Sequence, residues 1–323
     1  MSFAEKLVAW QRRHGRRGLP WQGTRDPYRI WLSEVMLQQT QVSTVIPYFE
    51  KFISKYRSVE ALAAASEDEV LRLWAGLGYY ARGRNLHRAA RQIAASGFPE
   101  SSLELQKLPG VGRSTAAAIA AFAFGERAAI LDGNVKRVLS RVYGIEKTER
   151  LWAQAERLLP KRGIEAYTQA LMDLGATICT RTPSCGGCPV KSRCVARKTG
   201  RIAELPAPRP RKPLPLRETT WFVYRHGGKV LLERRPSPGI WGGLWCFPEK
   251  KILPGKPKPL PVIEHGFTHF RLRIRPLLHE AKAQAGGLWS DIDDALAAAI
   301  PTPVKKLLQD LQRNATRRVR TRR

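Results

Sequence analysis

A proline-rich segment divides this chain into two parts of different character. Between Leu205 and Leu216, prolines stand at positions 206, 208, 210, 213 and 215 and alternate with basic residues. Proline lacks a backbone N–H and has a fixed φ, so such a run cannot continue a helix or a central strand and favours an extended conformation. The expected division is a helical domain at 1–200, a basic proline-rich linker at 201–217, a small α+β domain at 218–312 and a basic tail at 313–323.

Apolar periodicity separates the first part from the second. Apolar residues at 135, 138, 139 and 142 repeat at the spacing of one helix face. Residues 219–225 and 229–235 are rich in β-branched and aromatic side chains and are separated by His-Gly-Gly, which predicts a β-hairpin. Phe270, Leu272 and Ile274 alternate with arginines, as in a half-buried strand with a basic outer face. Residues 291–312 return to a helical pattern.

The charge balance points to a polyanionic partner. The 323 residues include 56 Lys and Arg against 27 Asp and Glu, a formal net charge of +29. Nucleic acid is the commonest such partner for a soluble chain, and a merely soluble basic surface is the alternative. No apolar run approaches the ~20 residues that span a bilayer, and the N-terminus lacks the pattern of a secretory signal. We expect a cytoplasmic, nucleoid-associated protein, and a disordered tail that either holds phosphates or is simply solvated.

Four of the five cysteines lie close together, at Cys179, Cys185, Cys188 and Cys194. In a reducing compartment this density favours a metal site over a set of disulfides. Four thiolates can saturate one tetrahedral zinc ion or hold an iron–sulfur cluster, and the spacing alone leaves the metal open. The isolated Cys246 is interpreted as a packed, small apolar residue.

Glu34 is a candidate general acid. Asp26-Pro27 predicts the start of a helix, and within that helix Glu34 falls on the apolar stripe three and four residues after Trp31 and Ile30. Burial there would raise its pKa, as an acid working near neutral pH requires. The alternative is a carboxylate at the edge of the stripe that reaches solvent.

Asp132 is a second candidate, at the start of the helix that carries the apolar face described above. A helix N-terminus favours the ionised carboxylate, so we expect a lowered pKa there. One raised and one lowered pKa is the pattern that separates an acid from a charge stabiliser. The alternative is an ordinary N-cap aspartate.

Residues 108–115, Leu-Pro-Gly-Val-Gly-Arg-Ser-Thr, form a glycine-rich turn before an alanine-rich helix. Backbone N–H groups at Gly110, Val111 and Gly112 could approach a DNA phosphate, with support from the helix N-terminus. The turn resembles the hairpin of helix-hairpin-helix DNA-binding proteins. An ordinary helix–helix turn is the alternative.

Five motifs together closely resemble the MutY family of adenine DNA glycosylases. They are PWQ at 20–22, SEVMLQQTQV at 33–42, GLGYYARGRNL at 76–86, LPGVGRST at 108–115 and LDGNVKRV at 131–138. The resemblance continues through GIWGGLWCFPE at 239–249, FTH at 267–269 and PTPVKKLL at 301–308, and so covers essentially the whole chain. It implies a monomeric enzyme that flips adenine mispaired with 8-oxoguanine or guanine out of double-stranded DNA. The enzyme then hydrolyses the N-glycosidic bond and leaves an abasic site.

The resemblance also implies roles for individual residues. Glu34 matches the acid that protonates adenine N7, Asp132 the carboxylate that stabilises the oxocarbenium-like sugar, and Asn134 a residue that forms hydrogen bonds within the site. The positions that match the adenine pocket are Trp21, Gln22, Leu37 and Gln169. Gln39 and Tyr79 match residues inserted into the DNA stack to hold the flipped state. The positions that match a loop in contact with the lesion are Phe267, Thr268 and His269.

Three departures from related patterns refine this interpretation. Ser114 stands where endonuclease III relatives carry a lysine that attacks the sugar, and a hydroxyl cannot form the Schiff base of a lyase. The C-terminal domain resembles Nudix hydrolases, but no acidic box follows GIWGGLW, so we expect a binding module without Mg²⁺-dependent hydrolysis. The first cysteine gap is one residue shorter than is usual in the family, and a 4Fe-4S cluster is favoured over zinc. The alternatives are a bifunctional oxidised-pyrimidine glycosylase and lyase, and a catalytically silent DNA-binding scaffold.

Overall fold

The computed structural model describes residues 1–207, 213–253, 255–281 and 288–320, with side chains through 313. It divides into two compact units, of which the first comprises residues 1–64 and 85–210 and the second residues 65–84 and 211–323. This differs from the expected division, which placed all of 1–200 in one domain. The reason is that Leu71 is fully buried within the apolar core of the second unit.

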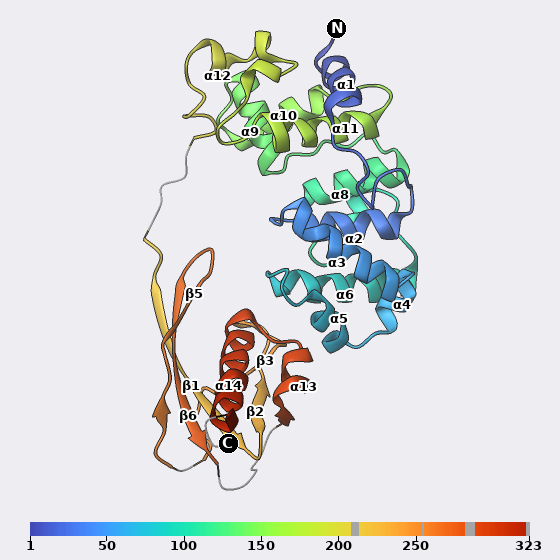
Figure 1. Cartoon of the computed structure of the whole chain (residues 1–323). Coiled ribbons are helices and arrows are strands. Elements are labelled where there is room, and N and C mark those ends of the chain that lie inside the picture. Colours follow the sequence, from blue (N-terminus) through green and yellow to red (C-terminus); the bar gives the residue numbers. More distant parts are fainter. Residues whose placement is uncertain (208–212, 254, 282–287, 321–323) are drawn as a thin grey trace. The chain divides into compact units, whose positions relative to one another are not determined.

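The first unit is helical, and Figure 1 shows its helices stacked in layers. α1 packs on α11, α2 on both α3 and α8, and α9 on both α10 and α12. The helices are α1 Phe3–His14, α2 Pro27–Leu37, α3 Val42–Lys55, α4 Val59–Ala64, α6 Tyr80–Ser96 (in this unit from residue 85), α7 Ser102–Leu105, α8 Arg113–Ile119, α9 Gly133–Tyr143, α10 Thr148–Arg157, α11 Ile164–Asp173 and α12 Val195–Lys198. α8 and α11 each continue into a π-helical turn, Ala120–Phe124 and Leu174–Ile178.

Two helices that position the site begin where the sequence predicts. Asp26 is the N-cap of α2, and its side chain accepts a hydrogen bond from the Tyr28 N–H at 2.9 Å. Pro27 follows at the first helical position, where its missing N–H costs nothing. On α9, the apolar face predicted from periodicity is buried: Val135, Val138, Leu139 and Val142.

The second unit contains a mixed sheet with helices against it (Figure 1). Its elements are α5 Glu67–Trp74, β1 Leu216–His226, β2 Lys229–Arg234, β3 Trp245–Cys246, β4 Lys258–Pro259, β5 Ile263–Gly266, β6 Arg271–Glu280, β7 Leu288–Asp291, α13 Ile292–Ala297 and α14 Thr302–Arg320. The strand order is β3-β2-β1-β6-β4, with β5 paired to β6 and β7 to β2. β1 and β6 run parallel from Leu216 opposite Arg271 to Arg225 opposite Glu280.

Two strand predictions are confirmed in this unit. β1 and β2 form the expected antiparallel hairpin, and the turn residues Gly227 and Gly228 have φ of 53° and 84°, which glycine adopts freely. On β6, Leu272 and Ile274 are buried. The arginine at 271 before them is exposed, as alternation predicts.

Two boundaries differ from expectation. The expected linker began at 201, but Leu205 is buried and its carbonyl accepts a hydrogen bond from Arg141 Nε at 2.8 Å. The tail was expected to be disordered from 313, but α14 continues to Arg320. No proline or glycine interrupts residues 312–320, so a helix nucleated by the buried Leu307, Leu308 and Leu311 can propagate. Residues 208–212 of the linker and 321–323 of the tail lie outside the described residues.

Within the described ranges, no helix is both long and apolar enough to cross a bilayer.

Candidate active site

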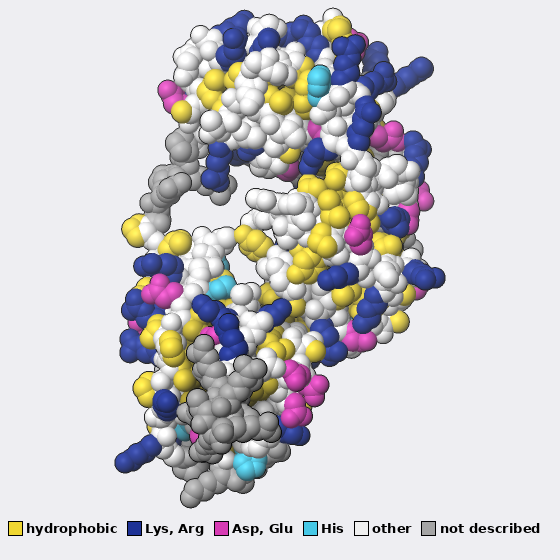
Figure 2. Space-filling view, in the orientation of Figure 1, with side chains coloured by type: hydrophobic (Ala, Val, Ile, Leu, Met, Phe, Trp, Pro, Cys, Tyr) yellow, Lys and Arg dark blue, Asp and Glu magenta, His cyan; other side chains and the backbone are white. Residues whose placement is uncertain are grey.

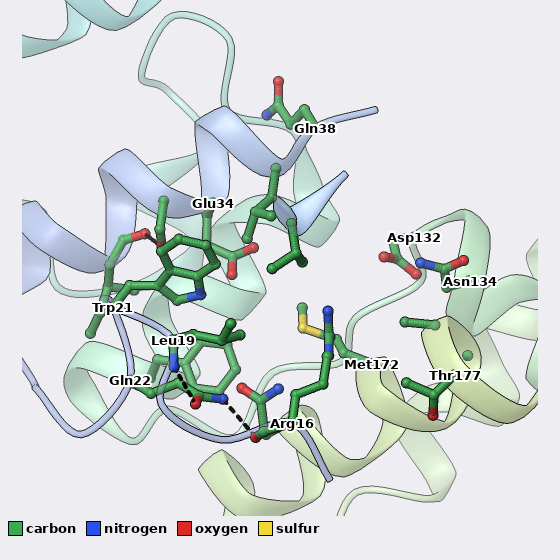
Figure 3. Close-up of a pocket in the computed structure, with 18 of the residues that line it drawn as sticks. Arg16, Leu19, Trp21, Gln22, Glu34, Gln38, Asp132, Asn134, Met172 and Thr177 are labelled. Carbon is green, nitrogen blue, oxygen red and sulfur yellow. Dashed lines mark hydrogen bonds between the residues drawn. The ribbon is translucent and has the colours of Figure 1, made fainter. Parts of the chain in front are cut away.

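A pocket of about 1530 Å³ lies within the first unit, between α2, the start of α9 and the end of α11. The expected catalytic and adenine-pocket residues all line it: Trp21, Gln22, Glu34, Leu37, Ser114, Asp132, Asn134 and Gln169. Figure 3 shows Glu34 on one side and Asp132 on the other, each with its carboxyl group directed into the space between them. The fold therefore brings together residues that are up to 148 positions apart in the sequence, from Trp21 to Gln169 (169 − 21).

Glu34 is held on α2 between buried neighbours. Ile30 and Trp31, which precede it on the same stripe, are almost fully buried. Burial and, to a lesser extent, the negative charge of Asp132 raise the pKa of Glu34 to about 8, while Arg16 opposes the shift. Glu34 is thus protonated at neutral pH, as the sequence predicted for a general acid.

Asp132 is the N-cap of α9, and its Oδ1 accepts a hydrogen bond from the Val135 N–H at 2.7 Å. Its pKa is nevertheless raised, because burial in the pocket wall outweighs the N–H groups of Val135 and Asn134 and the charges of Arg137 and Arg16. The prediction of a lowered pKa was therefore wrong. Arg16 favours the ionised form of both groups, whereas the two N–H groups and Arg137 act on Asp132 alone. The proton that the pair keeps near neutral pH is therefore assigned to Glu34.

Arg16 is a pocket residue that sequence reasoning missed. Its Nε donates to Asp173 Oδ1 at 2.7 Å and its backbone N–H donates to Asp173 Oδ2 at 3.1 Å. Asp173 is fully buried and also accepts from Gln169 Nε2 at 2.9 Å. The signal available in the sequence was an aspartate within the apolar run LMDLG, because a carboxylate buried there needs a cationic partner.

The adenine-pocket candidates are fixed by contacts with their neighbours. Gln22 Oε1 accepts from the Leu19 N–H and its Nε2 donates to the Arg16 carbonyl, both at 3.2 Å (Figure 3). The Trp21 ring meets Phe49 edge to face at 5.3 Å. These contacts order one wall of the pocket in the free protein, an arrangement that would lower the entropic cost of binding a ligand there.

Ser114 and Asn134 support the loop that carries Asp132. Ser114 Oγ accepts a hydrogen bond from the Leu131 N–H at 3.0 Å, so it holds the residue immediately before Asp132. Asn134 Oδ1 accepts from Arg137 Nη2 at 2.8 Å. Asn134 also packs closely on Gly175, where an added Cβ would lie 2.8 Å from Asn134 Cβ. The hydrogen bond from the Leu131 N–H gives Ser114 a positioning role. Its side chain has a hydroxyl and no amine, so it cannot form a Schiff base.

The glycine-rich turn lies between α7 and α8, beside the pocket rim. Gly110 has φ of 80°, and an added Cβ would lie 2.9 Å from Asn85 Cβ. Gly112 is the N-cap of α8 and has no side chain to bond the helix N–H groups. Gln38 Nε2 donates to the Gly110 carbonyl at 3.1 Å and so ties the turn to the end of α2. Gln39, which follows Gln38 in the chain, is exposed and has φ of 58°, a strained value for a residue with a side chain.

The remaining DNA-contact candidates belong to the second unit. Tyr79 also has a left-handed backbone, with φ of 46°, and its side chain is 43% exposed. Phe267 stacks on Phe270 at 4.3 Å between ring centroids. Thr268 and His269 are exposed beside it. The turn thus exposes two polar side chains, and the stacked Phe267 and Phe270 rings support it.

The four clustered cysteines line one small cavity of about 20 Å³. Arg141 braces their loop: Nη1 donates to the Thr180 carbonyl at 2.6 Å and lies 3.6 Å from Cys179 Sγ, and the Cys194 thiol donates to the Arg141 carbonyl at 3.3 Å. Among the described residues, no three His, Cys, Asp or Glu side chains come close enough to hold a single metal ion. Four thiols around one cavity are a donor set that could hold an iron–sulfur group. Cys246 is fully buried in the second unit, consistent with a packed apolar role.

Comparisons with known proteins agree with both units. Residues 32–161 match the HhH-GPD superfamily of base excision DNA repair proteins, and residues 220–310 match the NUDIX domain. Among solved structures, a thermostable thymine-DNA glycosylase has a TM-score of 0.57 at 30% identity over 61% of this chain and 95% of its own. A non-covalent endonuclease III–DNA complex has a TM-score of 0.54 at 22% identity over 61% of this chain and 94% of its own, which shows the shared fold.

Curated relatives match nearly the full length. The adenine DNA glycosylase of Buchnera aphidicola subsp. Baizongia pistaciae is 34% identical over 96% of this chain and 97% of its own. The human adenine DNA glycosylase is 32% identical over 96% of this chain and 74% of its own. The chain therefore belongs to the adenine DNA glycosylase family, within the helix-hairpin-helix base excision repair proteins.

Proposed function

We propose that this DNA N-glycosylase hydrolyses the N-glycosidic bond of adenine mispaired with 8-oxoguanine or guanine, with Glu34 as acid and Asp132 as charge stabiliser. The observation that carries the proposal is that both carboxyl groups face one pocket while the pKa of Glu34 is raised to about 8. Two carboxyl groups with different proton affinities allow one to donate a proton while the other remains charged.

In the proposed reaction, the flipped adenine enters between Trp21 and Leu37, and neutral Glu34 donates its proton to adenine N7. The bond between C1′ and N9 then breaks, and its electron pair leaves with the base. Ionised Asp132 stabilises the positive charge that develops on the sugar. Water adds at C1′, and the proton it releases restores Glu34. Arg16 stabilises the Glu34 carboxylate in the interval, since its charge favours the ionised form.

Duplex binding is proposed to use both the charge and the hairpin. The net charge of +29 favours a phosphate backbone, and Figure 2 shows many Lys and Arg side chains over the part of the first unit that carries α1 and α10–α12. Gly110, Val111 and Gly112 would contact a phosphate without reading sequence. Gln39 and Tyr79 would enter the base stack, and their strained backbones support this role because strain concentrates at functional sites.

The second unit is proposed to read the base opposite adenine. Its exposed Thr268 and His269 offer hydrogen-bonding groups, and the stacked Phe267 holds their turn in place. Residues 250–261 after the GIWGGLW segment contain Lys and Pro and no acidic residue. A binding role therefore suits this unit better than Mg²⁺-dependent hydrolysis.

A single-turnover assay tests the activity. Duplexes with adenine opposite 8-oxoguanine, adenine opposite guanine, or thymine glycol are incubated with excess enzyme, and each is analysed with and without alkali. Strand breaks at adenine that require alkali are expected of a monofunctional adenine glycosylase. Breaks at thymine glycol without alkali would instead identify a bifunctional lyase, and no breaks at all would identify a silent DNA-binding scaffold.

The four cysteines are proposed to hold one 4Fe-4S cluster, bound by Cys179, Cys185, Cys188 and Cys194. Such a cluster would join both ends of the loop 179–194 and so stiffen a segment that has little apolar core of its own. Iron and acid-labile sulfide analysis together with a broad visible absorption is the test. A colourless protein that contains zinc would contradict the proposal.

A further inference from the structure

The segment that carries Tyr79 is built into the second unit. Leu71 on α5 is fully buried in the apolar cluster that also contains Trp221 and Leu244. Gly243 approaches the same helix so closely that an added Cβ would lie 3.3 Å from Leu71 Cδ1. The core of the second unit therefore extends into the segment that leads to Tyr79.

Polar contacts join this segment to residues 239–245, a loop that ends at the first residue of β3 and is called the loop 239–245 below. The Trp245 indole N–H donates to Asp68 Oδ1 at 2.9 Å. Arg84 Nη1 donates to the Gly242 carbonyl from the far side of Tyr79 in the sequence. Asp68 and Arg84 thus hold the chain on both sides of Tyr79 against the same loop.

The loop 239–245 also contacts the proposed lesion-reading turn. The Trp241 ring lies 5.5 Å from Phe267 and 5.8 Å from Trp221. Trp241 has φ of 54°, a left-handed value that a bulky residue keeps only where its surroundings impose it. One loop therefore contacts both the turn at 267–269 and the segment that carries Tyr79.

Tyr79 is held locally as well. The Arg82 guanidinium lies 5.3 Å from the centroid of the Tyr79 ring and 5.4 Å from that of Trp74. Arg82 is only 9% exposed, so it is a fixed support for the Tyr79 ring. Contacts with the loop 239–245 set the backbone on either side of this support.

We propose that the loop 239–245 positions Tyr79 for insertion into DNA, through the Trp245–Asp68 and Arg84–Gly242 hydrogen bonds. Trp245, Asp68 and Arg84 are positioning residues, since they act through Tyr79 and the loop. The loop thereby couples the turn at 267–269 to the residue that enters the stack. This inference rests on the proposed function, in which Tyr79 is inserted and the turn reads the lesion.

The test is a double-mutant cycle in the full-length protein. Trp245→Phe keeps an aromatic ring but removes the N–H donor to Asp68. The Kd is measured for a duplex with a non-cleavable abasic analogue opposite 8-oxoguanine, and the saturating single-turnover rate is measured on adenine opposite 8-oxoguanine. We expect Trp245→Phe to weaken Kd about fivefold, as loss of one hydrogen bond predicts, with the saturating rate nearly unchanged. In a Tyr79→Ala background the same change should have no further effect.

Companion variants keep the test decisive if Trp245→Phe folds poorly. Asp68→Ala should reproduce the loss of affinity. Asp68→Asn should keep the affinity close to that of the wild type, because the amide oxygen can still accept a hydrogen bond from the indole N–H. Lys229→Gln, which breaks the exposed pair with Asp291 elsewhere in the unit, is the control and should leave Kd nearly unchanged. Equal losses in the wild-type and Tyr79→Ala backgrounds, or no loss in either, would overturn the positioning role. Absence of adenine excision by the wild-type enzyme would instead overturn the proposed function.

Discussion

Asp132 raises the pKa of Glu34, and both carboxyl groups face the same pocket. The two groups are 98 residues apart in the sequence (132 − 34) and come from helices that begin independently, each with an aspartate N-cap. Burial and the charge of Asp132 favour a proton on Glu34, while two backbone N–H groups and Arg137 favour ionised Asp132. This arrangement suits the proposed pairing of an acid, Glu34, with a charge stabiliser, Asp132.

The pH dependence of excision should follow this pair. Glu34 must be protonated to act, so the saturating single-turnover rate should fall as pH rises through about 8. Asp132 must be ionised, and because its pKa is raised, the acid limb should lie above the pH at which an ordinary aspartate titrates. Rates from about pH 4 to about pH 10 would show this profile. A rate that keeps rising above pH 8 would contradict the role of Glu34 as an acid.

Glu34→Gln should abolish base excision and leave duplex affinity nearly unchanged. The amide keeps the shape of the side chain but has no proton to transfer to N7 at neutral pH. Product formation and Kd are measured on the same duplex, with the exposed Glu50→Gln as the matched control. Normal excision by Glu34→Gln would refute the assigned role.

Asp132→Asn should cripple catalysis without a comparable loss of stability. Asparagine is as good an N-cap as aspartate, so the free energy of unfolding should change by less than about 1 kcal/mol. The lost negative charge should also lower the pKa of Glu34, which carboxyl-labelled NMR in the two proteins can compare. A loss of stability large enough to explain the lost activity would support the ordinary N-cap interpretation instead.

Ser114→Ala should slow excision by loosening the loop before Asp132. The Leu131 N–H would lose its acceptor, at a cost of about 1–3 kcal/mol in the free energy of unfolding. Denaturant titration and single-turnover rates are the measurements. Ser114→Thr keeps the hydroxyl and should behave more like the wild type, so a Thr variant as impaired as the Ala variant would count against the hydrogen bond as the cause.

Arg141→Met should destabilise the cysteine loop and reduce its iron content. Arg141 is 5% exposed, and its guanidinium donates to three backbone carbonyls, those of Thr180, Arg181 and Leu205. Leaving these carbonyls without a donor should cost about 3 kcal/mol. Iron per protein and Tm are measured beside Arg150→Met, an exposed position on α10. Full iron content with an unchanged Tm would show that Arg141 does not support the loop.

Much of the fold could be predicted from local patterns. The Asp26-Pro27 start of α2, the buried face of α9 and the alternation on β6 depend on neighbours within a few residues. The pairing of Arg16 with Asp173 could not be predicted, because 157 residues separate them (173 − 16). Nor could the assignment of residues 65–84 to the second unit, since it depends on how Leu71 fits a core formed from residues beyond 220.

The direction of the Asp132 pKa shift shows the same limit of prediction from local sequence within the site. The sequence by itself determined that Asp132 would cap a helix, because N-cap preference is set by the next three residues. It also determined that Glu34 would lie on an apolar stripe, because helical spacing is local. Only the tertiary structure decided how much water each carboxylate loses and which charges it meets. Desolvation and Coulomb interactions depend on distances through space, and a local pattern carries no information about those distances.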